Sequence, residues 1–183
     1  MAGNLKGRKF NFPDAKGLRP TLSKTRETLF NWLQFDIADK TIIEPYAGSG
    51  ALSLEAISRG AKKVCLIEKN RKVFKNLELN FKLLSNSQYQ LNNTDSVIFL
   101  DKQNIKPFDL IFLDPPFNQN LIPMTLELLS QKNYLHYESQ IYIESEYEIT
   151  PTLLENHLEY DCKIRKQKKS GNVHYCLISL EAI

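Results

Sequence analysis

The feature that most constrains the fold of this chain is a regular alternation of short apolar segments with helix-like segments, which begins at Thr41. Thr41–Glu44 and Lys63–Ile67 are apolar runs of strand length, and each is followed by a segment with helical periodicity. Parallel strands need a long crossover connection, usually a helix, so this alternation is typical of a parallel sheet with helices on both faces. It predicts a doubly wound α/β domain.

The same periodicities predict the individual elements. A helix is expected to begin at Ser23, a good N-cap residue, and to run to Phe35. Further helices are predicted at Ala51–Ser58, Arg71–Leu84, Val97–Leu100 and Leu121–Leu129. Gly60 is the expected C-terminal stop signal of the helix Ala51–Ser58. The predicted strands are Thr41–Glu44, Lys63–Ile67, Tyr89–Asn92, Phe108–Leu113, Gln140–Glu144, Tyr160–Lys168 and Val173–Leu180. The last two flank Ser170-Gly171, so we expect a mostly parallel, seven-stranded sheet with an antiparallel C-terminal edge hairpin.

Positive charge is concentrated near the two ends of the chain. Between Met1 and Arg26 there are seven basic residues and one acid, so this segment carries +6 while the whole chain carries +3. Turn-forming residues interrupt the segment, which suggests an arm over residues 1–22 that precedes one domain over 23–183. A second basic cluster near the C-terminus could equally be a solvated face or a contact to a polyanion; it comprises Lys163, Arg165, Lys166, Lys168 and Lys169.

Several classes of protein are disfavoured by composition. No apolar run is long enough to cross a bilayer, and the N-terminus lacks the apolar core of a secretory signal, so we expect a cytoplasmic protein. Cys65, Cys162 and Cys176 are far apart, and the three histidines share no spacing with them. Free thiols and the absence of a metal site are therefore expected.

The predicted strands end in acids. Glu44, Glu68 and Asp114 close the first, second and fourth strands, and Asp95 follows the third. Because ligands of such sheets bind at the carboxyl ends of the strands, we expect these acids to contribute to one site.

A glycine-rich turn, Glu44-Pro-Tyr-Ala-Gly-Ser-Gly50, leads from the first strand into a helix. Such turns also open dinucleotide-binding folds, but Ser53 replaces their third glycine, and Glu44 would repel a pyrophosphate. An acid suits the sulfonium and ammonium groups of S-adenosylmethionine better. Glu68 would then accept hydrogen bonds from the ribose hydroxyls. Asp95 would either accept a hydrogen bond from the adenine amine or serve only as a loop or capping residue.

The segment Phe108-Asp-Leu-Ile-Phe-Leu-Asp-Pro-Pro-Phe117 delivers Asp114 at the end of a hydrophobic strand. The two prolines restrict the backbone, so the Asp114 carboxylate and the Pro115 carbonyl are fixed acceptors. Together they can bind both N–H groups of an exocyclic amine on a base and direct its lone pair at a methyl sulfonium. Phe117 offers a face on which a flipped-out base can stack.

These motifs resemble a known family, the RsmD-type 16S ribosomal RNA guanine-N2 methyltransferases. The resemblance covers nearly the whole chain and rests on Gly7-Arg8-Lys9, Gly17-Leu-Arg-Pro-Thr21, Arg26-Glu-Thr-Leu-Phe-Asn-Trp-Leu33, Ala47-Gly-Ser-Gly-Ala-Leu52 with Leu54-Glu-Ala56, Asp114-Pro-Pro-Phe117 and Ile141-Tyr-Ile-Glu-Ser-Glu146. It implies a class I, Rossmann-like methyltransferase that uses S-adenosylmethionine to methylate one guanine of 16S rRNA, in the RNA or the 30S particle, during subunit assembly.

The resemblance also implies roles for individual residues. The catalytic candidates are Asp114, Pro115, Pro116 and Phe117. The cofactor-binding candidates are Glu44, Tyr46, Ala47, Gly48, Ser49, Gly50, Glu68, Lys69, Asp95, Ser96 and Asp114. The RNA-binding candidates are Arg8, Lys9, Arg19, Thr21 and Arg26, although Arg26 could instead hold the arm to the body.

Four positions depart from the family pattern. Glu44 stands where the family usually has Asp, and Tyr46 where it has Phe or a similar residue. Leu5 stands near a position that is typically aromatic, and Ser53 replaces a glycine, a change expected to affect helix packing more than catalysis.

Other functions are compatible with the same motifs. An adenine-N6 methyltransferase acting on DNA or RNA and a glutamine-N5 methyltransferase acting on protein both use an acid or amide followed by Pro-Pro and an aromatic residue. The basic ends disfavour a protein substrate. A non-catalytic RNA-binding assembly factor would not need the intact acids Glu68 and Asp114. We expect a monomer.

Overall fold

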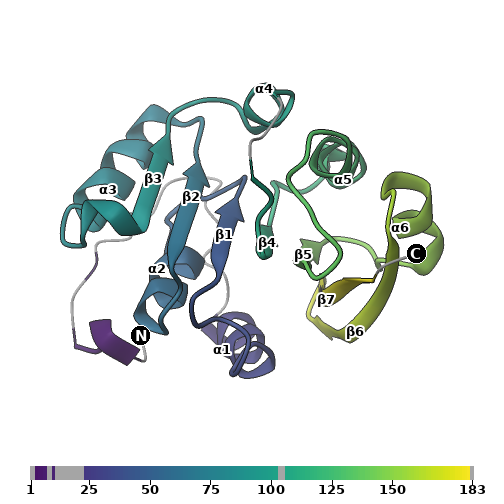
Figure 1. The fold of residues 1–183 in the computed structure, drawn as a ribbon, viewed down its shortest axis with the longest axis horizontal. Coiled ribbons are helices and arrows are strands. Elements are labelled where there is room, and N and C mark those ends of the chain that lie inside the picture. Colours follow the sequence, from purple (N-terminus) through teal and green to yellow (C-terminus); the bar gives the residue numbers. More distant parts are fainter. Residues whose placement is uncertain (1–2, 8–9, 11–22, 103–105, 182–183) are drawn as a thin grey trace. The chain divides into compact units, whose positions relative to one another are not determined.

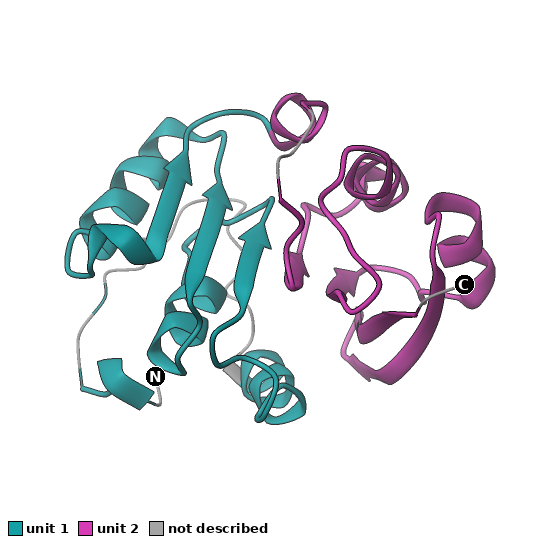
Figure 2. Cartoon of the chain, in the orientation of Figure 1, with its two compact units in different colours: residues 1–95 teal, residues 96–183 magenta. Residues whose placement is uncertain are grey.

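The computed structural model describes residues 3–7, 10, 23–102 and 106–181, and Figure 1 shows its fold. The chain divides into two compact units, residues 1–95 and 96–183, which Figure 2 distinguishes by colour. The predicted division into an arm over 1–22 and a domain over 23–183 stays a prediction, because most of residues 1–22 lie outside the described ranges.

The first unit contains three parallel strands, β1 (Thr41–Glu44), β2 (Lys63–Ile67) and β3 (Tyr89–Asn92). Its helices are the α-helices α1 (Ser23–Trp32), α2 (Ala51–Ser58) and α3 (Arg71–Phe81), together with the short 3₁₀ helices η1 (Gly3–Leu5) and η2 (Asn86–Gln88). β2 pairs with β1 on one side and β3 on the other. Their carboxyl ends therefore share one edge of the unit.

The second unit begins with α4 (Ser96–Leu100) and the parallel strands β4 (Leu110–Leu113) and β5 (Gln140–Ser145), which α5 (Leu121–Gln131) connects. After α6 (Pro151–His157), the strands β6 (Asp161–Ser170) and β7 (Val173–Glu181) form an antiparallel hairpin. β7 also pairs antiparallel with β5. The hairpin thus joins the sheet through its second strand.

The strands follow the order β3-β2-β1-β4-β5-β7-β6 in one seven-stranded sheet. This confirms the predicted fold class, a mostly parallel sheet with an antiparallel C-terminal hairpin. Every predicted strand is present, with ends that differ by two residues or fewer. The strands were predictable because buried parallel strands are nearly continuous apolar runs, and all four residues of β4 are buried.

The helices differ more from the prediction. α1 ends at Trp32 rather than Phe35, because the chain turns there and leaves the Phe35 side chain 89% exposed instead of packing it. α3 ends at Phe81 rather than Leu84, since the Leu84 amide bonds to the Phe81 carbonyl in a tighter turn. The short helices η1, η2 and α6 were not predicted. For α6 a signal existed: Thr150 caps its first turn and Pro151 occupies the start.

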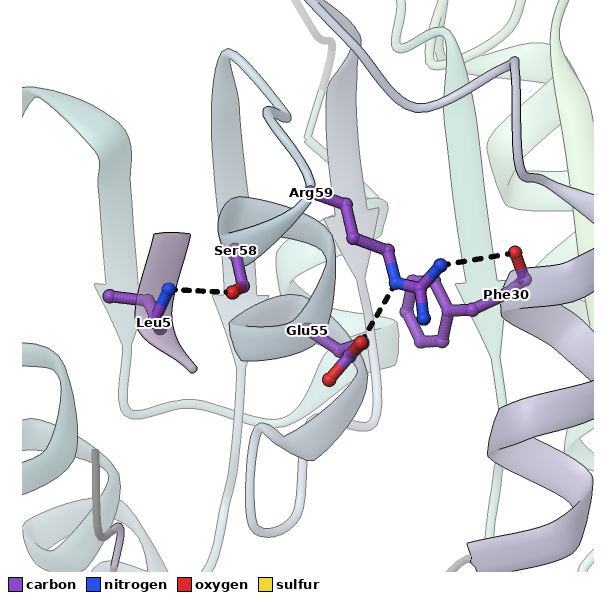
Figure 3. A network of polar contacts seen from close by, with 5 residues as sticks. All are labelled: Leu5, Phe30, Glu55, Ser58 and Arg59. Atoms are coloured by element: carbon purple, nitrogen blue, oxygen red, sulfur yellow. Dashed lines mark hydrogen bonds and ion pairs between the residues drawn. The ribbon is translucent and has the colours of Figure 1, made fainter. Parts of the chain in front are cut away.

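A polar network on α2 anchors the N-terminal elements (Figure 3). The Leu5 amide of η1 donates to the Ser58 hydroxyl at 2.9 Å. Arg59 donates to the buried Glu55 carboxylate at 2.8 Å and to the Phe30 carbonyl of α1 at 3.4 Å, and its guanidinium lies 5.0 Å from the centre of the Phe30 ring. The elements on both sides of the basic segment 8–22 are therefore held on the same buried helix.

Candidate active site

The glycine-rich turn is fixed by backbone hydrogen bonds at the start of α2. The Ala47 amide donates to the Ile67 carbonyl of β2 at 2.9 Å, and the Gly50 amide donates to the Ala47 carbonyl at 2.8 Å. Gly50 has a φ of 72°, and a Cβ added there would lie 2.4 Å from the Leu77 side chain. Only glycine meets both the left-handed conformation and the close approach of α3.

Glu44, at the end of β1, is only 3% exposed. Its carboxylate accepts hydrogen bonds from the Ser53 side chain and backbone, in the first turn of α2. Burial raises the pKa of Glu44 to about 8, and the Ser53 hydrogen bonds oppose that rise. Since Gly50 has no capping side chain, Glu44 serves as the acceptor at this helix terminus.

Glu68, which follows β2, ties the glycine turn to the neighbouring loop. Its Oε2 accepts the Gly48 amide at 2.9 Å, and its Oε1 accepts the Asn70 amide at 2.6 Å. Each carboxylate oxygen has a second lone pair. The partly exposed Glu68 therefore keeps acceptor capacity for a ligand hydroxyl at the carboxyl end of β2.

Three further residues border this edge of the first unit. Lys69 forms an ion pair with Asp95 at 3.7 Å, and both side chains are substantially exposed. Asn93, which directly follows β3, donates from its side chain to the carbonyls of Glu68 at 2.7 Å and Lys69 at 3.3 Å. Asn93 is absent from the predicted site residues, because only acids were considered at the strand ends; its position directly after β3 was the available signal.

The remaining cofactor-binding candidates vary in exposure. Ala47 and Gly50 are buried in the turn, whereas Tyr46, Gly48 and Ser49 are partly exposed. Ser96 is 5% exposed and begins α4 in the second unit. The candidates from Glu44 to Asp95 thus gather at the carboxyl ends of β1, β2 and β3, as the strand-end argument predicts; their roles in binding stay predictions.

In the second unit, the Asp-Pro-Pro-Phe motif leaves the end of the fully buried strand β4. The Asp114 and Phe117 side chains are partly exposed, Pro115 is buried, and Pro116 is exposed. A rigid, buried strand thus presents an acid and an aromatic ring at its carboxyl end.

The end of β5 lies beside this motif. In the sheet register Phe112 of β4 is opposite Tyr142 of β5, and their rings meet edge to face. The Tyr142 hydroxyl donates to the buried Glu144 carboxylate at 2.8 Å. Burial, followed by the charges of Glu144 and Asp114, raises the pKa of Tyr142 well above its ordinary value, so Tyr142 stays a neutral donor near the Asp114 carboxylate.

Glu146 holds the loop that follows the motif. Its Oε1 accepts the Asn118 amide at 2.8 Å, and Asn118 has a left-handed φ of 60°. This bond fixes the residue next to Phe117. No role was predicted for Glu146, although an acid just beyond a strand end was again the signal.

Of the RNA-binding candidates, Arg8, Lys9, Arg19 and Thr21 lie outside the described residues, and Arg26 is partly exposed on α1. All three cysteines are free, as predicted, and burial raises the pKa of Cys65 and Cys176 to about 12. Within the described ranges, no group of three or more His, Cys, Asp or Glu side chains is placed to hold a metal ion. No helix there is long and apolar enough to span a membrane.

Comparison with solved structures agrees with this architecture. A putative methyltransferase from Escherichia coli aligns with a TM-score of 0.87 at 38% identity, covering 100% of this chain and 97% of that chain. A putative methylase from Haemophilus influenzae aligns with a TM-score of 0.80 at 35% identity, covering 98% of this chain and 96% of that chain.

Curated relatives match over nearly the same length. The ribosomal RNA small subunit methyltransferase D of Escherichia coli is 39% identical over 100% of this chain and 89% of that protein. The protein of the same name from Haemophilus influenzae is 40% identical over 97% of this chain and 91% of that protein. The family model described as conserved hypothetical protein 95 matches residues 1–179. By these matches and the motifs above, the chain belongs to the RsmD-type methyltransferase family.

Proposed function

We propose that this protein transfers a methyl group from S-adenosylmethionine to the exocyclic N2 amine of one guanine in 16S rRNA during small-subunit assembly. The observation that carries the proposal is the Asp-Pro-Pro-Phe motif at the exit of the buried strand β4, in a chain of this family.

The residues of the first unit fit the proposed cofactor. Glu44 is a buried carboxyl group whose pKa burial raises to about 8, and no ion pair within the described residues reaches it. A positively charged ligand bound beside it would favour the ionised form and so suits these surroundings. Glu68 has spare acceptor capacity at the end of β2, where a ribose would be bound. When bound, S-adenosylmethionine supplies an electrophilic methyl group on a sulfonium.

The residues of the second unit supply the other requirements of the reaction. The lone pair of an exocyclic amine is delocalised into the base, so the nitrogen is a poor nucleophile. The Asp114 carboxylate and the Pro115 carbonyl would accept its two N–H groups and turn the lone pair toward the methyl donor. Asp114 would also stabilise the positive charge that develops on nitrogen, and Phe117 would stack on the flipped base. The proton then leaves to Asp114 or to water.

The choice of substrate rests on charge and on relatives. The segment 1–26 carries +6, which suits a phosphate backbone. The curated relatives are named for methylation of small-subunit ribosomal RNA. We place the reaction in the cytoplasm, with the enzyme acting as a monomer on 16S rRNA or on a 30S assembly intermediate.

Methyl transfer from labelled S-adenosylmethionine tests the proposal. We would offer the full chain 30S particles that lack native methylations, deproteinised 16S rRNA and duplex DNA in parallel, and then digest each to nucleosides. The proposal predicts label in N2-methylguanosine from at least one RNA sample. Label only in N6-methyladenine would identify an adenine methyltransferase, and cofactor binding without any transfer would favour a non-catalytic assembly factor.

A further inference from the structure

The C-terminal hairpin contains a second concentration of positive charge, on an edge strand. β6 stands last in the strand order and pairs with β7 alone within the described sheet (Figure 1). Its five basic side chains are all exposed: Lys163, Arg165, Lys166, Lys168 and Lys169. We call these five residues the β6 basic strand.

The charges of the hairpin are segregated along its length. Its two acids, Asp161 and Glu181, are opposite each other at the open end. The basic residues follow toward the Ser170-Gly171 turn. No ion pair within the described residues involves any of the five. The strand therefore presents cations that none of the described residues neutralises through an ion pair.

Two local features accompany the exposed side chains. A register shift between Ile164 and Lys166 leaves Arg165 without a partner residue on β7, as in a β-bulge. Gln167, the neutral residue among the lysines, donates to the Ile149 carbonyl at 3.2 Å. The residue of this stretch that bonds to a segment outside the hairpin is thus uncharged, while the charged residues beside it are exposed to solvent.

Five like charges on one strand repel one another. In the register with β7, Lys163, Lys166 and Lys168 share one face of the strand. Neighbouring side chains on one face are about 7 Å apart, which is within the Debye length of about 8 Å at physiological salt. One or two lysines would suffice to keep an edge strand from pairing with another copy. Five exposed cations on one strand, three of them on one face, are better explained by an anionic partner, whose binding relieves the repulsion.

We propose that the β6 basic strand is a binding surface for the phosphate backbone of the substrate RNA. The inference rests on the proposed function, which makes RNA the substrate, and adds a contact region that is distant in sequence from the arm 1–22. From Lys163 to Lys169 the strand extends about 20 Å, long enough to follow several successive phosphates. Phosphate contacts of this kind position a nucleic acid without reading its sequence.

The test variant replaces Lys166, Lys168 and Lys169 by Gln in the full chain. The matched control replaces three exposed lysines of the first unit by Gln: Lys62, Lys75 and Lys82. Both variants lose the same charge, so a difference between them reports position rather than net charge. Affinity for deproteinised 16S rRNA and for 30S particles is measured across a salt series, together with affinity for S-adenosylmethionine and methyl transfer.

For the test variant we expect weaker RNA binding and a weaker dependence of that binding on salt. The slope of log affinity against log salt should fall in magnitude by about 2, because each lost phosphate contact reduces the magnitude of the slope by about 0.7 to 0.9. The control should keep the wild-type slope, and both should keep wild-type cofactor affinity. Equal RNA affinity and slope in the test variant and wild type would overturn the inference. So would a loss of binding confined to 30S particles, which would indicate a protein contact.

The result separates the two proposals. If the wild-type chain methylates 16S rRNA and the test variant binds it as the wild type does, the inference alone fails. If the wild-type chain neither binds nor methylates 16S rRNA, the proposed function fails and the inference with it. Should the triple variant not fold, Lys168→Gln and Lys169→Gln are measured singly, with an expected slope change of about 0.7 to 0.9 each.

Discussion

Replacing Glu44 by Gln should make the stability of the ligand-free protein less dependent on pH. In the folded chain burial raises the pKa of Glu44 from an ordinary 4.5 to about 8. Well below pH 4.5 the carboxyl group is protonated in both states, so its ionisation does not lower the stability of the folded chain. As pH rises from 4.5 to about 8, the unfolded chain ionises while the folded chain keeps the proton, so this contribution to stability is progressively lost.

The magnitude follows from the two pKa values. A difference of one in pKa corresponds to about 1.4 kcal/mol, so the full change approaches roughly 5 kcal/mol, and the window from pH 5 to pH 8 contains about 4 kcal/mol of it. Such a change is large beside the usual 5 to 15 kcal/mol of stability of a domain. The amide side chain of the variant would keep an oxygen that accepts the Ser53 hydrogen bonds but would have no proton to lose.

The assay is urea unfolding of wild type and Glu44→Gln at several pH values between 5 and 8, without ligand. The free energy of unfolding of the variant, relative to wild type, should rise by about 4 kcal/mol over this range. Glu148→Gln, at an exposed position, controls for the loss of one acidic residue. A difference between Glu44→Gln and wild type that stays constant with pH would refute the reasoning, because it would mean that Glu44 is not desolvated in the folded chain.

Three other predictions follow from the site and the arm. Gly50→Ala should lower the free energy of unfolding by about 2 to 4 kcal/mol in urea titrations, since it combines a positive φ with a Cβ too close to α3. Gly171→Ala, at a positive φ with open space around it, should lower it by only about 1 kcal/mol, and equal losses in the two variants would contradict the packing argument. Glu146→Ala should lower kcat, because it releases the Asn118 amide, and should leave cofactor affinity unchanged. Glu146→Gln keeps a hydrogen-bond acceptor and should retain most of the wild-type rate, so an equal loss of kcat in both variants would argue against a role for this hydrogen bond. Arg8→Ala should weaken RNA binding and its salt dependence with unchanged cofactor affinity, and wild-type binding across a salt series would show that Arg8 does not contact RNA.

The parts of the fold that could be predicted are those for which a local pattern and its tertiary role coincide. β4 is an uninterrupted apolar run because it is buried, and the glycine turn is visible because only Gly50 tolerates both its φ and the approach of Leu77. Phe35 misled the prediction of α1, since an apolar residue at helical spacing is exposed after the chain turns.

The contacts that could not be predicted join residues that are distant in sequence or neutral. Ser53 was interpreted as a change in helix packing, but its hydroxyl and amide bond to Glu44, and that pairing requires the register of β1 against α2. Asn93 and Glu146 act through hydrogen bonds to backbone groups 24 to 28 residues away. Such partners are determined by where the strands end in space, which periodicity alone does not specify.

The most direct test of the central claim is a comparison of Asp114→Ala with wild type in two assays, binding of S-adenosylmethionine and transfer of its methyl group to 16S rRNA. Asp114 is proposed to orient the base amine, so the account predicts that transfer is lost while the variant still binds the cofactor. Methyl transfer at the wild-type rate by Asp114→Ala would contradict the account.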